Sequence, residues 1–218
     1  MKDSLIIEKA IEEIENKSWG VTEEFLKIHQ LEYVDNKPVI SRIDKNKPDG
    51  TVIIYFVVAN EQFYFAVYLD TKPEISVRSI YIEPYHSVYF GATSDNVNFK
   101  ELSNITTLNV TGGWNKGDKV KWAKKYYKNT CIRFEPNPKA DEFEDKIEKL
   151  LDYLEQDKEG INQLVDIADG YVQVFSSFHN GNTMLGGYHL DLKTIKRLAN
   201  LNLEIDFDIC ADGNFYKD

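Results

Sequence analysis

The chain has 218 residues, 42% hydrophobic and 28% charged, which is enough to bury the core of one large domain or of two small ones. Its formal net charge of −10 at pH 7 opposes general attraction to nucleic acids and anionic lipids, and favours a basic partner. No apolar run reaches the roughly 18 residues that a membrane span needs. The N-terminal sequence MKDSLIIEKAIEEIENK lacks the features of an export signal, so we expect a cytoplasmic protein.

The first 84 residues predict a helical start followed by a β-meander. Residues 5–14 carry apolar side chains at helical spacing, and Thr22 is a candidate cap for a second short helix. Two strands with a turn between them follow at 51–58 and 62–70, and a third strand stops before Pro84. We therefore expect residues 1–84 to form one unit.

Residues 85–218 predict a second, α+β unit in which helices and strands alternate. The clearest helix covers 141–156, where an apolar stripe recurs every three to four residues and Asp141 with Glu144 resembles a capping box. The dipeptide Asn180-Gly181 predicts a hairpin turn between two strands. The other predicted elements are strands at 87–95, 107–111 and 129–135, helices at 98–106 and 161–168, and a closing helix and strand at 191–209.

Two helix-to-strand segments of this unit match each other at an offset of 93 residues. The apolar positions of 97–110 align with those of 190–203, and the cap residues Asn98 and Asp191 correspond. Duplication and convergent packing both explain such a match. The fold we predict is α+β, with antiparallel or mixed sheets, packed helices, and ferredoxin-like split β-α-β units in the C-terminal part.

Four segments together resemble a known family. They are LNVTGGWNKGD at 108–118, DKIEKLLDYLE at 145–155, the YVQVFSSFHNGNT segment, and the closing DLKTIKRLANLNLEIDFDI. In order and spacing they resemble the bacterial domain-of-unknown-function family 4279, over about residues 86–212. The residues that match its Trp-x-Lys-Gly-Asp signature are Trp114, Lys116, Gly117 and Asp118. The resemblance implies an α+β fold, a bacterial source and, from members near toxin and immunity genes, an immunity-like role; it implies no established activity.

The glycines around Trp114 have the spacing of a phosphate-binding P-loop but not its chemistry. Gly112 and Gly117 fit, whereas Asp118 stands where the P-loop lysine belongs, and a carboxylate there would repel phosphate. We expect a plain turn with Trp114 packed against the core. The alternative is a small-ligand-binding protein or enzyme with a site around Trp114, Lys116 and Asp118.

The lysine-rich stretch 100–128 raises a second alternative, single-strand nucleic-acid binding. Its seven lysines are interleaved with aromatic residues, among them Trp122, as in proteins that stack bases. The acidic segment 135–169 competes for those lysines, so nucleic-acid binding is not the favoured prediction. The four histidines have no zinc spacing, and His179 and His189 are predicted on opposite faces of the hairpin, so we predict no metal site.

The last predicted strand places Glu204, Asp206 and Asp208 on one face and apolar residues on the other. Carboxylates about 6.6 Å apart along a strand are too distant to chelate one ion without other ligands. They form an acidic surface for a basic protein. The predicted function is a non-catalytic bacterial binding protein, an immunity-like inhibitor of a basic toxin, with no catalytic residues and no cofactor.

Overall fold

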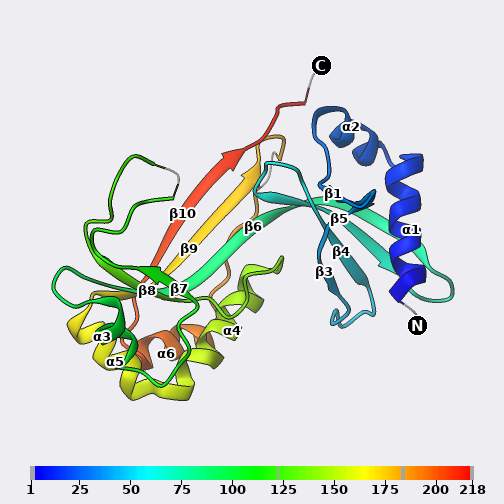
Figure 1. The fold of residues 1–218 in the computed structure, drawn as a ribbon. Helices are drawn as coiled ribbons and strands as arrows, with labels where there is room; N and C mark the ends of the chain where they lie inside the picture. Colours follow the sequence, from blue (N-terminus) through cyan, green and yellow to red (C-terminus); the bar gives the residue numbers. More distant parts are fainter. Residues whose placement is uncertain (1–2, 122, 183–184, 217–218) are drawn as a thin grey trace. The chain divides into compact units, whose positions relative to one another are not determined.

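The computed structural model describes residues 3–121, 123–182 and 185–216, and Figure 1 shows its fold. The chain forms two compact units. Unit 1 contains Met1–Tyr85, Ser176–Gly186 and Ile209–Asp218, and unit 2 contains His86–Phe175 and Gly187–Asp208. The sequence assigned the whole of 85–218 to one unit, whereas Tyr85 and the segments Ser176–Gly186 and Ile209–Asp218 lie in unit 1. No described helix is both long and apolar enough to cross a membrane.

Unit 1 packs two helices on an antiparallel meander. Its elements before Tyr85 are α1 (Asp3–Asn16), α2 (Gly20–Ile28), β1 (Tyr33–Val34), β2 (Lys37–Pro38), β3 (Ile40–Asp44), β4 (Val52–Val57) and β5 (Phe63–Asp70). The predicted hairpin is β4 and β5, paired from Val52 opposite Leu69 to Val57 opposite Tyr64. Strand β3 was not predicted from the sequence. Ile6, Phe25 and Phe65 lie in the buried core that these elements enclose.

The junction between α1 and α2 is held by a buried carboxylate. Thr22 does not cap α2, which begins at Gly20; its hydroxyl instead donates to Glu13 Oε1 at 2.6 Å. The Trp19 amide and the Ser18 hydroxyl also donate to Glu13. Glu13 thus uses both its oxygens to hold the turn, which is why it is buried at 3% exposure.

Strand β6 (Ser76–Ser94) is one continuous strand of 19 residues that contributes to both units. The sequence predicted two strands with a break before Pro84, and this was wrong. Pro84 lies opposite Phe63, the first residue of β5, so its missing N–H falls where the pairing with β5 ends. Further along, Phe90 to Ser94 pair with β8.

Unit 2 places its helices on one face of a sheet (Figure 1). Its elements after β6 are α3 (Phe99–Ser103), β7 (Gly112–Trp114), β8 (Thr130–Phe134), α4 (Phe143–Leu154), η1 (Glu155–Asp157), α5 (Lys158–Ile167), β9 (Gly170–His179), α6 (Leu192–Asn200) and β10 (Ile205–Asp212). The predicted stripe of α4 is buried, with Ile147, Leu150 and Leu154 packed into one core with Ile132 of β8 and Val172 of β9. No strand forms at 107–111, where one was predicted.

The helix caps of unit 2 follow the sequence in two cases and depart from it in one. Asn98 and Glu101 form a capping box, and Asp191 accepts from the Thr194 amide at 2.7 Å. The predicted capping box of Asp141 and Glu144 is wrong, because α4 begins at Phe143. Asp141 accepts instead from the side chains of Asn137 and Lys149, at 2.7 and 2.6 Å.

The predicted hairpin at Asn180-Gly181 is also wrong. Residues 185–190 form no strand, and the Met184 position of the prediction lies outside the described residues. The end of β9 pairs with β10 instead, since the Asn180 amide donates to Asp212 O at 2.9 Å and its side chain to Gly213 O at 2.8 Å. Asn180 and Gly181 do form a turn, in which the Asn182 amide donates to His179 O at 3.0 Å, but the strand beside the end of β9 is β10.

The strand order is β10-β9-β6-β5-β4-β3, with β8 pairing both β6 and β7. The Val172 amide donates to Glu204 O, and eight residues later the Asn180 amide donates to Asp212 O. Because the residue numbers of donor and acceptor rise together, β9 and β10 are parallel strands, with α6 between them in the chain. The pairs within β3–β6 are antiparallel. The fold is therefore α+β with a mixed sheet, as predicted, while the ferredoxin-like order stays a prediction.

Asp157 connects the loop after α3 to the start of α5. Its Oδ1 accepts from the Gly160 amide at 3.0 Å. Its Oδ2 accepts from the Thr107 amide at 2.6 Å, the Thr106 hydroxyl at 2.8 Å and the Thr107 hydroxyl at 3.0 Å. These hydrogen bonds, that of the Thr107 amide first, lower the pKa of the carboxyl to about 2. The carboxylate form therefore holds two segments that are about 50 positions apart in sequence.

We predict that Asp157→Ala lowers the free energy of unfolding by about 2 kcal/mol, because a helix cap and three further donors lose their acceptor. Urea titration followed by circular dichroism measures the change. Asp166→Ala, on the exposed side of α5, is the matched control and should change the free energy by less than about 0.5 kcal/mol. Equal effects of the two substitutions would contradict this role for Asp157.

Candidate functional site

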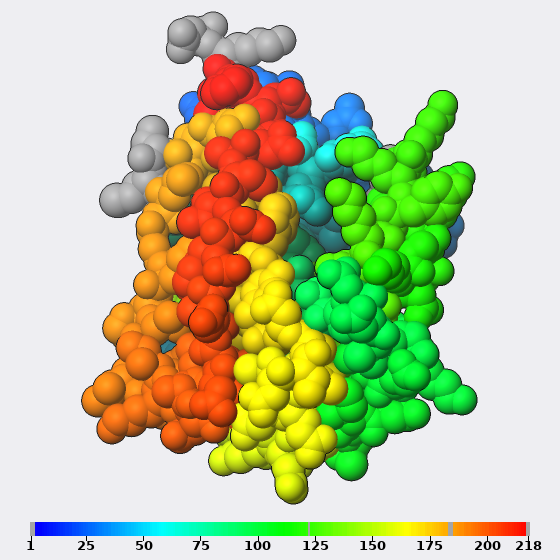
Figure 2. Space-filling view, turned by 90° about the vertical axis from the view of Figure 1, so that its left-hand side faces the viewer, coloured from blue at the N-terminus to red at the C-terminus, as the bar shows by residue number. Residues whose placement is uncertain are grey.

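Strand β10 presents carboxylates on one side and apolar side chains on the other. Phe207 packs between Tyr188 and Phe143, with ring centroids 4.8 and 5.9 Å away. On the opposite side, the Gln173 side chain donates to Asp208 Oδ2 at 3.2 Å and to Asp206 O at 3.4 Å. The alternation predicted for Glu204, Asp206 and Asp208 is thus present, and all three are exposed. Figure 2 shows β10 as the red band along this face, beside the yellow residues at the start of β9.

A cleft of about 400 Å³ adjoins this acidic face. The side chains that give it its charge are Asp169, Glu204 and Asp206, with Tyr171 beside them. Burial raises the pKa of the Tyr171 hydroxyl, and the charges of Asp206, Asp169 and Asp208 add to the effect. Within the described part of the chain these carboxylates form no ion pair, so the cleft carries uncompensated negative charge.

The segment that matches the Trp-Lys-Gly-Asp signature is a loop closed by its own backbone. The Gly117 amide donates to Tyr127 O and the Tyr127 amide to Asp118 O, each at 2.9 Å. Gly117 has φ +89°, which a glycine adopts without strain, and Asp118 Oδ2 accepts from the Asn115 amide at 2.8 Å. Two residues of the signature therefore have a structural task in shaping the loop.

The other two signature residues diverge. The indole of Trp114 stacks on the Tyr127 ring at 4.2 Å, and Trp114 and Asp118 line a hollow of about 420 Å³. Lys116 turns instead to Asp95, donating to its carbonyl oxygen at 3.0 Å. Trp122, which the sequence grouped with these aromatics, lies outside the described residues. The structure thus brings together Trp114 and Asp118 but not Lys116.

The close approach of β7 to β8 limits position 113, just before the loop, to glycine. Gly113 has φ +142°, and a Cβ atom added to it would lie 2.1 Å from the Cys131 carbonyl oxygen. Real Cβ atoms do not come this near to backbone, so position 113 accepts only glycine in this geometry. The glycine serves the pairing of β7 with β8, so the plain turn predicted here is wrong: residues 112–114 are a short strand, and Trp114 packs on Tyr127 and not in the unit 2 core.

Unit 1 contains a buried histidine pair that the sequence did not predict. His29 ends α2 and His179 ends β9, 150 residues away, and their Nε2 atoms are 3.0 Å apart. The Asn214 amide donates to His29 Nε2 at 3.3 Å, and the Gly181 amide donates to His179 Nδ1 at 3.0 Å. Glu61 Oε1 lies 3.6 Å from His29 Nδ1. No sequence spacing signals a contact between residues so far apart.

The backbone donors determine which nitrogen of each ring carries a proton. His29 accepts at Nε2, so its proton is on Nδ1, facing Glu61. His179 accepts at Nδ1, so its Nε2 carries the proton and donates to His29 Nε2 and to Asn214 O, 3.1 Å away. A protonated Nε2 on His179 cannot ligate a metal, and the pair is therefore a neutral hydrogen-bonded clasp over residues 213–214.

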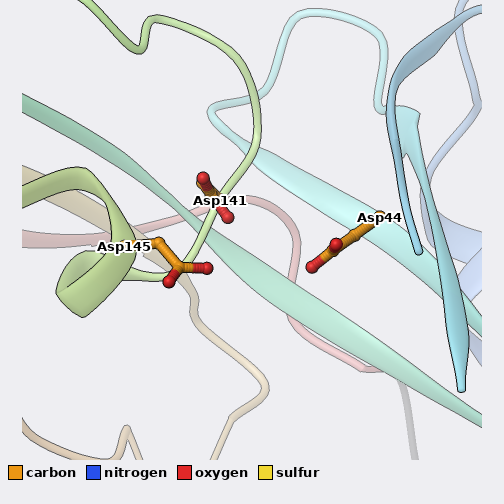
Figure 3. Close-up of side chains that lie close together, drawn as sticks. All are labelled: Asp44, Asp141 and Asp145. Carbon is orange, nitrogen blue, oxygen red and sulfur yellow. The ribbon is translucent and has the colours of Figure 1, made fainter. Parts of the chain in front are cut away.

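Three aspartates are labelled in Figure 3. Asp141 lies on the segment that leads into α4, Asp145 lies in the first turn of that helix, and both belong to unit 2. Asp44 is the last residue of β3 and belongs to unit 1. Its Oδ1 lies 3.4 Å from Arg42 Nη2, and its Oδ2 lies 3.7 Å from Lys47 Nζ. The positive partners, Lys149 for Asp141 and these two for Asp44, explain the buried carboxylates within each unit.

A comparison with protein families places the chain. The model of the family described as Domain of unknown function (DUF4279) matches residues 83–212. The chain belongs to this family. The searches of curated proteins and of solved structures found no match.

The DUF4279 match contains both the acidic face of β10 and the hollow beside Trp114. It also contains His179, whereas His29 lies outside it. The clasp therefore joins a residue of the family region to a residue that precedes it in the chain.

We predict that acid loosens the clasp. Burial lowers the pKa of both His29 and His179 from the ordinary value of 6.5, although a backbone contact with Asn214 opposes the effect. The folded state therefore disfavours the proton, so the stabilising contribution is complete above about pH 6.5 and declines as the pH falls below it. Hydrogen exchange should show protection of the Asn214 and Gly181 amides falling between pH 7.5 and 5.5, by about tenfold for each histidine released.

The paired variant His29→Gln with His179→Gln should lose this pH dependence, since neither glutamine titrates. Amides in the middle of β4, such as that of Ile54, are the internal reference and should keep their protection. Protection factors of Asn214 and Gly181 that do not change with pH in the natural sequence would contradict the prediction.

Proposed function

We propose that this protein is a non-catalytic bacterial cytoplasmic binding protein that uses the acidic face of β10 to hold a basic protein partner, in an immunity-like role against a basic toxin. The observation that carries the proposal is the set of exposed carboxylates along β10 and in the adjoining cleft, which form no ion pair with the described residues. Family members near toxin and immunity genes suggest the role, and the partner of such a surface is a positively charged protein.

The position of β10 supports a surface for a protein. It stands at the end of the strand order, so one of its backbone edges has no strand partner among the described residues. An edge strand offers backbone donors and acceptors to a partner, and charged side chains there discourage indiscriminate pairing.

The distribution of charge supports a basic partner more than a metal ion. Alternate residues of a strand are about 6.6 Å apart, which spreads the carboxylates of Glu204, Asp206 and Asp208 along the surface. Such a row suits several cationic side chains of a nuclease-like toxin, whose own substrate site is positive. Long-range attraction from a protein of charge −10 would also raise the association rate.

The test begins with co-purification of the chain with the protein encoded by the neighbouring gene. Association rates are then measured by surface plasmon resonance at low and high salt. We predict that Glu204→Lys, Asp206→Lys and Asp208→Lys in one variant lower the association rate at least about tenfold at low salt, and that the natural protein loses this advantage at high salt.

The matched control reverses Glu8, Glu12 and Glu15, which are exposed on α1 and give the same change in net charge. It should reduce the association rate far less than the β10 variant does. Equal rates for the natural protein and the β10 variant would reject this surface. A bound partner that is acidic would reject the proposed role.

A further inference from the structure

The outer face of the unit 2 sheet contains an arginine set between two glycines. In β8, Ile132 and Phe134 enter the buried core, so Arg133 between them points to the other face. Its register partners are Gly91 on β6 and Gly112 on β7. A Cβ atom added to Gly112 would meet nothing within 4 Å, so the sheet surface is open beside the guanidinium.

This opening is the hollow of about 420 Å³ that Trp114 borders. Trp114 and Tyr127, stacked on each other, form an aromatic wall. The charged side chains that line it are Arg133, Lys119, Lys121, Asp118 and Glu135.

The anionic groups of the hollow accept hydrogen bonds from neighbouring residues, whereas its cationic groups form no ion pairs with the described residues. Asp118 accepts from the Asn115 amide, and Glu135 accepts from the Ser87 hydroxyl at 2.7 Å. Lys119, Lys121 and Arg133 form no ion pair with any described residue. The hollow thus has three cations against two carboxylates, a local excess of one positive charge on a protein whose total charge is −10.

Two residues that line the hollow each carry a buried hydrogen-bond donor that has no acceptor among the described residues. Trp114 Nε1 and Arg133 Nε are both inaccessible to solvent and unpartnered within the described chain. Leaving such a donor unpaired costs about 1–3 kcal/mol, so native structures rarely do so without a reason. The Cζ atom of Arg133 lies 3.4 Å from the centroid of the Tyr89 ring. This cation–π contact holds the guanidinium in one orientation while its Nε has no acceptor.

We propose that this hollow binds a small ligand through an oxyanion, a carboxylate or phosphate group. Both donors are closed to solvent, so the side chains that line the hollow must shift on binding for the oxyanion to accept from Arg133 Nε and Trp114 Nε1. Lys119 and Lys121 supply further positive charge, and the Trp114–Tyr127 wall contacts the rest of the ligand. The site differs from the one expected around Trp114, Lys116 and Asp118, because its centre is Arg133 and Lys116 takes no part. It stands apart from the acidic face of β10 and does not depend on the proposed function.

The experiment follows the indole N–H signal of Trp114 by two-dimensional ¹⁵N NMR, assigned with Trp114→Phe. Inorganic phosphate, succinate and uncharged glycerol are titrated at constant ionic strength. The expected result is a saturable downfield shift with phosphate or succinate and none with glycerol. A shift with phosphate alone assigns a phosphate group, and a shift with succinate alone assigns a carboxylate.

Three variants make the test specific. Gly112→Val adds a side chain to the hollow at a position where a Cβ atom meets nothing within 4 Å, and Arg133→Lys keeps the charge but removes the Nε donor. Each should weaken binding of the saturating anion at least about tenfold. Gly187→Val, at another open glycine, is the control and should bind as the natural protein does. Thermal unfolding confirms that each variant is folded. An absent shift, or a shift that persists unchanged in Gly112→Val and Arg133→Lys, overturns the proposal.

Discussion

The two-residue repeat of the β-strand determines which side chains of unit 2 form the core and which lie on the outer face of the sheet. Each strand must bury one row of side chains against the helices α3 to α6, and the same geometry sends the alternate row to the opposite face. Ile132 and Phe134 on β8 and Val172 and Val174 on β9 occupy the core row. Arg133, Tyr171 and Asp206 are consequently free for other interactions.

The outer face carries opposite charges at different strands. Carboxylates gather around β10 and the start of β9, while the free cations gather at β8 and the loop after β7. Tyr171 and Tyr89 lie between these groups, and burial raises the pKa of both hydroxyls. A single sheet face therefore carries two regions of opposite charge, although the protein as a whole is acidic.

The sequence predicted the features that depend on neighbours along the chain. The alternation at 204–209, the stripe of α4 and the caps at Asn98 and Asp191 are all local, and the structure confirms them. The unpredicted features depend on pairing between distant residues. His29 meets His179 across 150 positions, and the opening beside Arg133 exists only because strand register places two glycines next to it.

The steric limit at Gly113 bears on how variation within the family should be interpreted. A side chain there would collide with the β8 backbone whether or not any ligand binds, so an invariant glycine at this position would report on strand spacing alone. Position 112, next to it, has room for a side chain. If relatives also keep a glycine at 112, steric exclusion by the protein does not explain its conservation. A ligand that occupies the hollow would explain it, because the ligand needs the space that a side chain would fill.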